Sequence, residues 1–365
     1  MYVDIPNLLN LSTVPGIGAT KLRSLVAKFK STKKVFEASV EELKAIDGID
    51  LKGAREIKNF SNFEYGEIQY ERAKKLNAEI VTFWDDKYPI VLKKIHDPPV
   101  FLFLKGKFDE YDRYSLAIVG TRSPSSYGKI IAEKIARDLS NKGLTVVSGL
   151  ARGVDTIAHS TAISTGGRTI AVTGSGLDVI YPSENRKLTE QIWESGAVIT
   201  EQPMGAKPDA VNFPKRNRII AGLTLGTIVI EAGEKSGALI TANLALEYNR
   251  EVFAIPGNIT NNKSWGCNQL IKEGAKLVQS IDDILDELKT QLRRFSAQAK
   301  QSQNFDDLQA NEMYILKNLT TQPIHIDELA RKLNQSTGQL LSILLTLEFK
   351  DFVRQLPGKL FVRTF

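Results

Sequence analysis

The sequence predicts an α/β fold with a Rossmann-like, doubly wound parallel sheet, and two observations support this prediction. Short β-branched or apolar runs recur from residue 116 onward, and each run ends in small or polar residues before a helical stretch. Their starts lie about 24 to 30 residues apart, the length of one strand plus one crossover helix. Such connections join parallel strands and cover the sheet with helices. The runs are 116–119, 145–147, 169–172, 197–199, 227–230 and 252–254.

Composition is that of an ordinary globular protein. The 365 residues include 48 Lys or Arg and 42 Asp or Glu, giving a net charge of +6, with 42% hydrophobic residues. These values argue against disorder and a disulfide scaffold, and the length predicts two or three domains. Because Cys267 is the single cysteine, the start resembles no export signal and no apolar run reaches 18 residues, we expect a cytoplasmic protein without membrane insertion.

Two helical modules flank the predicted sheet domain, which we assign to residues 76–288. Residues 1–75 read as a SAM-like helix-hairpin-helix domain, with one hairpin at Val14-Pro-Gly-Ile-Gly18 and a weaker copy at 46–50, where Asp50 replaces the second glycine. The hairpins are predicted either to pack into a small helical module or to contact duplex phosphates. Residues 76–110 are expected to be a loop-rich extension that adds one strand to the sheet.

The C-terminal part predicts a linker and a winged helix. Residues 289–305 are polar, Gln-rich and without apolar periodicity, which is typical of a linker. Residues 306–365 predict helices near 313–319, near 327–333 and after Ser336, followed by two strands around Pro357-Gly358. The third helix is rich in leucine and has no Arg before Lys350, so partner docking or packing is favoured over base reading.

Three successive loops predict an anion-binding site. In an open α/β sheet, ligands bind beyond the carboxyl ends of the strands, where loops enter helices. The first three runs end in loops that combine glycine with hydroxyl groups, and two of them add an arginine that can clamp a phosphate. The alternative is that the glycines only make tight turns. The candidate residues are Thr121, Arg122, Gly149, Arg152, Gly174, Ser175 and Gly176.

The fourth run leads into a long loop and then a basic helix start. Lys215, Arg216, Asn217 and Arg218 place three positive charges where an isolated helix prefers anions. Either an acidic protein surface covers these charges, or they hold phosphates together with the helix N-terminus. Phe213, which precedes Pro214 and these charges, is predicted to stack on a base, as in single-strand binding, or to be a core residue.

The familiar enzyme motifs are incomplete. Gly233-Glu-Lys-Ser236 copies only the tail of a P-loop, and Gly174-Ser-Gly176 lacks the third glycine of the dinucleotide fingerprint. Asp155 and His159 share a helical spacing, but without a nearby nucleophile we expect a capping carboxylate and a buried imidazole. The three histidines and the cysteine lack zinc-site spacing. The sequence therefore predicts no enzyme, no catalytic residues, no metal and no cofactor.

These motifs together resemble the DNA-processing protein A (DprA/Smf) family. The resemblance covers roughly residues 80–285 and is carried by Ile118-Val-Gly-Thr-Arg-Ser, Tyr127-Gly128, Ser148-Gly-Leu-Ala-Arg-Gly-Val-Asp-Thr-Ile-Ala-His159, Gly174-Ser-Gly-Leu-Asp-Val-Ile-Tyr-Pro182, Phe213-Pro-Lys-Arg-Asn-Arg-Ile-Ile-Ala-Gly222, Ser236-Gly-Ala-Leu-Ile-Thr-Ala242 and Val252-Phe-Ala-Ile-Pro-Gly257. It implies a bacterial, ATP-independent protein that binds and protects single-stranded DNA during natural transformation and loads a RecA-type recombinase onto it. It also implies a homodimer, with a single-stranded DNA-binding protein as a further candidate partner.

The resemblance implies the same DNA-binding residues that the loops predict, together with Lys207. Thr121 stands where serine is commoner in the family, which preserves the hydroxyl, and Lys207 is the single positive charge in the loop 204–211. The alternative function is a Rossmann-like enzyme that cleaves nucleoside monophosphates. Such enzymes resemble one another in a Gly-Gly-X-Gly-Thr run that precedes a catalytic Glu. Residues 230–234 lack this glycine run. A purely structural scaffold for the recombinase is a third reading, but it leaves the basic loop unexplained.

Overall fold

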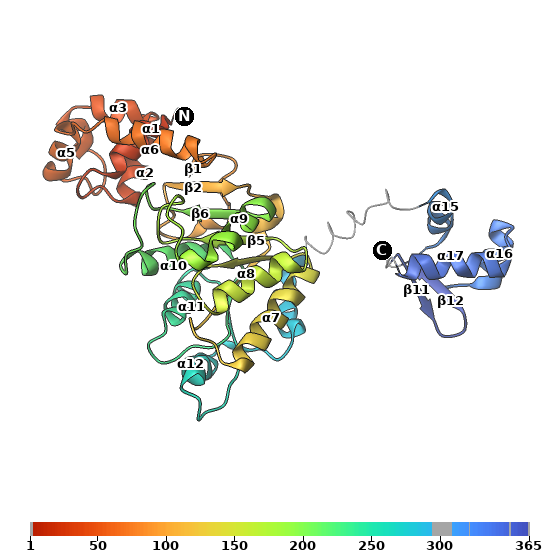
Figure 1. Ribbon diagram of the computed structural model, residues 1–365. Coiled ribbons are helices and arrows are strands. Elements are labelled where there is room, and N and C mark those ends of the chain that lie inside the picture. Colours follow the sequence, from red (N-terminus) through yellow and green to blue (C-terminus); the bar gives the residue numbers. More distant parts are fainter. Residues whose placement is uncertain (1–2, 294–308, 321, 350–351, 364–365) are drawn as a thin grey trace. The chain divides into compact units, whose positions relative to one another are not determined.

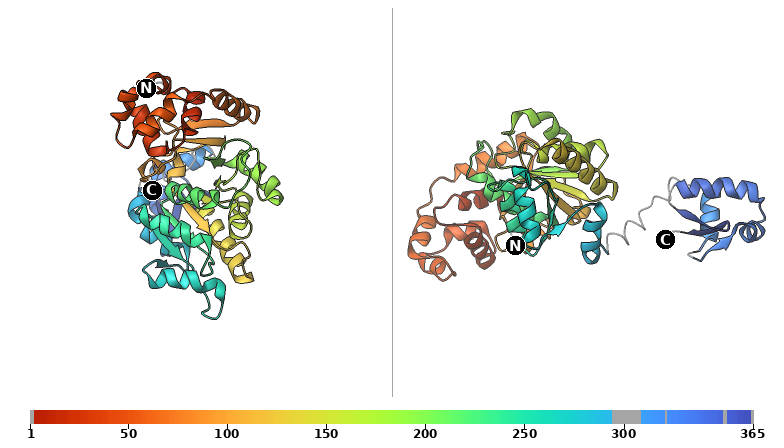
Figure 2. Two further views of the ribbon diagram at one scale, coloured as in Figure 1. Left: turned by 90° about the vertical axis from the view of Figure 1, so that its left-hand side faces the viewer. Right: turned by 90° about the horizontal axis from the view of Figure 1, so that it is seen from below.

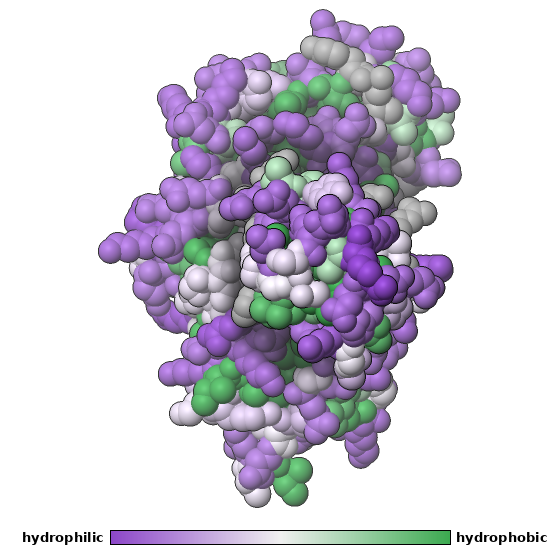
Figure 3. Space-filling view, turned by 90° about the vertical axis from the view of Figure 1, so that its right-hand side faces the viewer, coloured by the Kyte–Doolittle hydropathy of each residue, from purple (hydrophilic) through white to green (hydrophobic). Residues whose placement is uncertain are grey.

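The computed structural model describes residues 3–293, 309–320, 322–349 and 352–363 (Figure 1). Contacts divide the chain into two compact units, residues 1–291 and 292–365. The predicted boundary near residue 75 falls inside the first unit and stays a prediction. Within the described residues, no helix is both long enough and apolar enough to cross a membrane. On the face that Figure 3 shows, hydrophilic residues predominate and apolar residues occur in small scattered groups.

The first unit is built on a mostly parallel sheet of nine strands, which confirms the predicted fold class. The strand order is β1-β2-β6-β5-β4-β3-β7-β8-β9. All six predicted runs are strands of this sheet, and they pair in parallel because a crossover helix separates each from the next. The parallel strands are β3 (Ser115–Val119), β4 (Thr145–Ser148), β5 (Thr169–Val172), β6 (Ala197–Thr200), β7 (Gly226–Val229), β8 (Glu251–Ala254) and the short β9 (Lys276–Leu277).

Two antiparallel strands, where one was predicted, extend the β6 edge. β1 (Glu79–Thr82) pairs with β2 (Phe101–Gly106), and β2 pairs with β6 with Phe103 opposite Thr200. Both apolar stretches of residues 76–110 are therefore strands. A 3₁₀ turn at Leu92–Lys94 lies between them, where the chain reverses and returns beside β1.

Helices cover both faces of the sheet. Helices α7 (Ser126–Asn141), α8 (Val154–Ser164) and α9 (Arg186–Ser195) pack in succession, as do α10 (Asn212–Leu223) and α11 (Gly237–Glu247) (Figures 1 and 2). Strand residues alternate between the two cores: Ile170 and Val172 pack with Ile219 of α10, whereas Ala171 packs with Ile192 of α9. This alternation explains why the strands have no polar face. Helices α12 (Trp265–Lys272) and α13 (Ile281–Glu287) complete the unit.

The N-terminal helices form two similar hairpins. Gly16 and Gly48 have φ of 77° and 82°, the left-handed region that favours glycine. Gly18 and Asp50 are both extended N-caps, so the position where Asp50 replaces glycine needs no glycine. The Asp50 carboxylate accepts a hydrogen bond from Gly53 N (2.8 Å) and caps its own helix. The helices are α1 (Ile5–Ser12), α2 (Ala19–Phe29), α3 (Thr32–Glu37), α4 (Val40–Lys44), α5 (Leu51–Lys58) and α6 (Glu64–Lys75).

The second unit has the predicted winged-helix elements and one further strand. Its helices are α15 (Ala310–Asn318), α16 (Ile326–Leu333) and α17 (Thr337–Phe349), and its sheet has the order β10-β12-β11, with β10 at Ile324–His325, β11 at Val353–Leu356 and β12 at Leu360–Arg363. Leu340, Leu344 and Leu347 of α17 are fully buried in this unit. Residues 289–293 of the predicted linker are helical, with Leu292 buried, and 294–305 lie outside the described residues.

Candidate functional site

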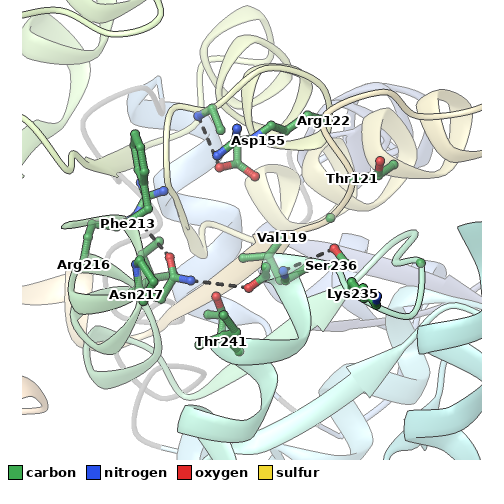
Figure 4. A pocket seen from close by; sticks show the side chains of 18 of the residues that line it. Val119, Thr121, Arg122, Asp155, Phe213, Arg216, Asn217, Lys235, Ser236 and Thr241 are labelled. Atoms are coloured by element: carbon green, nitrogen blue, oxygen red, sulfur yellow. Dashed lines mark hydrogen bonds between the residues drawn. The ribbon is translucent and has the colours of Figure 1, made fainter. Parts of the chain in front are cut away.

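The strand order reverses at β3, which has β4 on one side and β7 on the other. Loops that leave neighbouring strands in opposite directions open a crevice at such a point. A cavity of about 520 Å³ lies there, at the carboxyl ends of β3, β4 and β7 (Figure 4). We call it the switch-point cavity. Its lining includes Val119, Thr121, Arg122, Asp155, Phe213, Arg216, Asn217, Ile220, Lys235, Ser236, Ala238, Thr241 and Lys263.

Arg216 is buried beneath this cavity and holds the ends of two strands. Its Nη1 donates to the carbonyl oxygens of Gly149 and Val172, and its Nε donates to Asn217 Oδ1 (3.2 Å). A Cβ at residue 149 would come within 2.3 Å of Arg216 Nη1, so glycine at this position admits the guanidinium. Arg216 therefore joins the ends of β4 and β5 to the start of α10.

Charge compensation under the cavity comes from Asp155. Its carboxylate accepts from the backbone N–H groups of Gly149 (3.2 Å) and Ala151 (3.3 Å). Burial raises the pKa of Asp155, and the positive charge of Arg216 opposes that rise. Burial lowers the pKa of Arg216 to about 10, against the effect of Asp155, so the guanidinium stays charged at neutral pH. The prediction that Asp155 caps its helix is wrong: the N-cap of α8 is Gly153, without a side-chain cap, and Asp155 in the first turn instead accepts from the loop before it.

The basic run at the start of α10 divides between the interior and the solvent. Arg218, 13% exposed, donates to the Asp97 carbonyl oxygen (2.6 Å) and forms ion pairs with Glu201 and with Asp97 (3.6 Å). Lys215 is exposed and has no ion-pair partner among the described residues. The structure therefore leaves Lys215 exposed to solvent, where it lines none of the hollows of the site, and pairs Arg218 with acidic groups of the protein.

Arg122 and Phe213 lie at the junction of three adjoining hollows. The Arg122 guanidinium carbon is 5.6 Å from the centre of the Phe213 ring, and the Tyr181 ring is 6.0 Å from it. Beside the switch-point cavity, one narrow hollow reaches Arg152 and Ser175, and a third of about 440 Å³ reaches Pro208 and Ala210. Phe213 is only half-buried, and one side of its ring packs over Gly174, where a Cβ would be 3.0 Å from the ring.

The remaining predicted residues surround this junction without all facing it. Arg152 is exposed and paired with Glu184. The Ser175 hydroxyl donates to Val179 O (2.7 Å), and Gly176 N donates to Ala206 O (3.0 Å), which connects the third loop to the loop that carries Lys207. Lys207 itself is exposed and lines none of the three hollows.

Sequence reasoning left out several residues that line the switch-point cavity. Lys235, Ser236 and Thr241 follow β7, and Lys263 follows β8 and donates to Ser123 O (2.6 Å). The loop after β7 completes neither a P-loop nor a Gly-Gly-X-Gly-Thr run, and residues 236–242 belong to the family resemblance without being predicted site residues. The place of this loop at the carboxyl end of a parallel strand, like the first three loops, is the signal that identifies these residues.

His159 takes no part in the cavity. It is completely buried on α8, where its Nδ1 lies 2.7 Å from Thr169 Oγ1. Burial lowers the pKa of His159 to about 3, with Arg216 adding to the effect, so the imidazole is neutral. Among the residues that the structure describes, no group of three or more His, Cys, Asp or Glu side chains is placed to hold a metal ion.

The fold and the site together define a Rossmann-like protein with a basic, aromatic-lined crevice at the switch point of its sheet. Comparison with protein families identifies it further. The family model of DNA recombination-mediator protein A matches residues 79–289, a SAM-like helix-hairpin-helix tandem matches 8–60, and the DprA winged helix domain matches 299–359. The chain belongs to the DNA recombination-mediator protein A (DprA/Smf) family.

Relatives of known sequence and structure agree with this assignment. Protein Smf of Synechocystis is 34% identical over 389 residues, covering 96% of this chain and 97% of the relative. DNA processing protein DprA of Streptococcus pneumoniae is 45% identical over 249 residues, covering 68% and 88%. The X-ray structure of the S. pneumoniae protein superposes with a TM-score of 0.69 at 37% identity, covering 79% of this chain and 99% of that one.

A second solved structure is DNA processing protein A from Helicobacter pylori, described for its single-stranded DNA binding mode. It has a TM-score of 0.52 at 31% identity and covers 58% of this chain and 97% of that chain.

Proposed function

We propose that this protein binds single-stranded DNA across the junction of the three hollows. The observation that carries the proposal is the position of Phe213, half-buried, with the Arg122 guanidinium 5.6 Å from its ring centre. The accessible part of an aromatic ring beside a cation offers a stacking face to a base and a charge to the adjacent phosphate, the combination that binds single strands. The description of the H. pylori structure, which names single-stranded DNA binding, supports the same ligand.

Each side chain at the junction has a role that its environment allows. Arg122 and Lys215, both exposed, contact phosphates, and Tyr181 extends the stacking surface of Phe213. Arg216 and Asp155 act as positioning residues, because their contacts hold the loops and leave them buried. Since stacking and phosphate contacts carry no base information, binding is independent of sequence.

The same proposal extends to partners. As a member of a recombination-mediator family, the protein protects the bound strand, forms a homodimer and loads a RecA-type recombinase onto the DNA during natural transformation. Strand-exchange assays with a RecA-type protein, with and without this protein, test the loading. Sedimentation at micromolar concentration tests the dimer.

The alternative function is cleavage of nucleoside monophosphates by a catalytic Glu, and the contacts of Glu231 argue against it. This carboxylate follows β7 but is only 1% exposed, and it accepts from Ser125 N (2.8 Å) and Ser125 Oγ (2.5 Å). It therefore holds the loop after β3 instead of facing the cavity.

One pair of assays separates the two functions. Fluorescence anisotropy with a labelled oligothymidylate is expected to show salt-dependent binding, while a base-release assay on nucleoside monophosphates shows no product. Base release without strand binding would replace the proposal by the enzyme.

A further inference from the structure

We propose that Gln69 of helix α6 holds the loop 201–211 in the position that binds the strand, so that the N-terminal helices take part in single-strand binding. This loop joins β6 to α10 and lines the third hollow of the junction with Pro208 and Ala210. The inference rests on the proposed function and deepens it, because it names the contact that fixes one wall of the junction. Gln69 is then a positioning residue.

The side-chain amide of Gln69 pairs with the backbone of Met204 in both directions. Its Oε1 accepts from Met204 N (2.7 Å), and its Nε2 donates to Met204 O (3.3 Å). Gln69 and Met204 are 5% and 3% exposed, and they lie 135 positions apart in the chain. Because a buried backbone N–H or C=O is costly to leave unpaired, this pairing fixes Met204 against α6.

Two further contacts strengthen the attachment of Met204 to the N-terminal helices. The side chain of Arg72, one turn along α6, donates from its Nη1 to Met204 O (3.4 Å). The Met204 side chain belongs to the apolar core that includes Leu8 and Ala73 of these helices. Met204 is therefore held to the N-terminal helices both by its backbone and by its side chain.

The two residues after Met204 are attached to a second element, the loop after β5. Gly205 N donates to Asp178 Oδ1 (2.7 Å), and Gly176 N donates to Ala206 O (3.0 Å). The loop after β5 also lines the narrow hollow of the junction. This short segment therefore connects α6 to two walls of the junction at once.

The tip of the loop, residues 207–211, depends on this attachment for its position. Its hydrogen bonds within the described part of the chain stay inside the loop and the first turn of α10, for example from Val211 N to Asp209 Oδ1 (3.0 Å). Most of the tip is exposed. Gln69 lines none of the three hollows, so it acts on a bound strand through the loop and not by contact.

The test is Gln69→Leu, which nearly keeps the side-chain volume but pairs with neither backbone atom of Met204. Fluorescence anisotropy with an oligothymidylate is expected to show binding weaker by up to about tenfold, because a loop that is free before binding must be ordered by it. Hydrogen exchange of the amides of 204–206 is expected to be faster than in the wild-type protein.

Ile57→Val is the matched control. Ile57 of α5 is buried in the same core, and its truncation lowers stability while it leaves the pair of Gln69 and Met204 in place. Strand affinity and the exchange of 204–206 should stay as in the wild-type protein. Thermal melts compare the stability of the variants. If Gln69→Leu does not fold, Gln69→Asn takes its place, because its shorter amide cannot reach both backbone atoms of Met204.

A second background separates positioning from a general effect on the fold. Replacing residues 207–210 by glycine removes the side chains with which the tip meets the strand, and should itself weaken binding. In that background Gln69→Leu is expected to change the affinity less than about twofold, because no contact is left for it to position. A further loss as large as in the wild-type background would overturn the inference.

The outcomes also separate this inference from the proposed function. If Gln69→Leu binds the oligothymidylate with wild-type affinity, whatever its loop exchange, the positioning role is wrong while strand binding stands. The same holds if Ile57→Val loses as much affinity as Gln69→Leu. If wild-type protein binds no oligothymidylate, the proposed function itself fails.

Discussion

Charged side chains lie both beneath the switch-point cavity and around its opening, but their surroundings differ. Beneath it, Arg216 and Asp155 are 7% exposed and use their polar atoms on backbone groups of the loops. Arg122 and Lys235 line the cavity and are exposed, as is Lys215 at the start of α10, and none of the three has an ion-pair partner in the described residues. Neighbours in sequence can differ in burial: Lys215 is exposed and Arg216 is buried, because successive positions on a helix point about 100° apart.

This difference separates two consequences of mutation. A buried charge that loses its partner leaves an uncompensated group in a low-dielectric interior, so its removal lowers the free energy of unfolding. An exposed charge contributes little to folding and acts on a ligand through counterion release. The free energy of unfolding and the salt dependence of strand binding are therefore the two measurements that distinguish the buried charges from the exposed ones.

The largest effect is expected for Arg216→Ala. The substitution leaves Asp155 as an uncompensated buried carboxylate and removes donors from Gly149 O and Val172 O, so the free energy of unfolding should fall by about 3 to 5 kcal/mol. Chemical denaturation measures the loss. Arg152→Ala, which removes an exposed arginine paired with Glu184, is the matched control and should leave stability nearly unchanged. Equal stability of both variants would contradict the buried framework.

The buried imidazole of His159 leads us to expect a loss of stability in acid. The pKa of His159 is lowered to about 3 in the folded protein, below the ordinary value of 6.5 that applies to the unfolded chain. Below pH 6.5 the unfolded chain takes up a proton that the folded chain does not, so this contribution is complete above pH 6.5 and is lost as pH falls toward 3.

At pH 5 the loss from His159 amounts to about 2 kcal/mol. Unfolding free energies measured between pH 7 and pH 5 check this value. His159→Gln, which cannot titrate, should have a flatter pH dependence, and an unchanged slope in that variant would assign the loss to other groups.

Phe213→Ala tests the proposed stacking of a base on the half-buried ring of Phe213. Loss of one stacked base weakens strand binding by about 1 to 3 kcal/mol, and the salt slope stays the same because no charge is removed. Anisotropy titrations at three salt concentrations measure both quantities. A sharp fall in melting temperature with unchanged affinity of the folded protein would instead make Phe213 a core residue.

Arg122→Ala and Arg218→Ala form a matched pair, one removing an exposed arginine and the other an ion-paired, mostly buried one. Arg122 is exposed, so its loss should lower the log-log salt slope of strand binding by up to about 0.7. Arg218 already pairs with Asp97 and Glu201, so its loss should leave the slope unchanged and lower the melting temperature. Salt titrations and thermal melts of both variants give the answer, and a reduced slope for Arg218→Ala would place that side chain on the DNA.

The smallest effect is expected from removing residues 296–365. The second unit has its own core, and all residues proposed to contact the strand lie in the first unit. Affinity for oligothymidylate should change less than twofold by anisotropy. Loss of most of the affinity would make the winged helix a primary DNA contact.

Much of the fold was predictable because its signals are local. The six runs from 116–119 to 252–254 are strands, since β-branched stretches at crossover spacing have few other solutions. The second antiparallel strand was missed because short apolar runs in a loop-rich segment do not show how they pair. The role of Asp50 was also open, because only backbone angles show which of the two hairpin positions must be left-handed.

By itself the sequence determined which edge of the sheet carries the candidate site, because every loop with glycine, hydroxyl and arginine follows a strand that runs in the same direction. Tertiary structure alone decided which of those charges are buried. Lys215, Arg216 and Arg218 look equivalent in sequence, yet one faces solvent, one pairs with carbonyl oxygens beside Asp155 and one pairs with Asp97 and Glu201. Their partners come from strands and loops up to 121 residues away in the chain, and only folding brings these groups into contact.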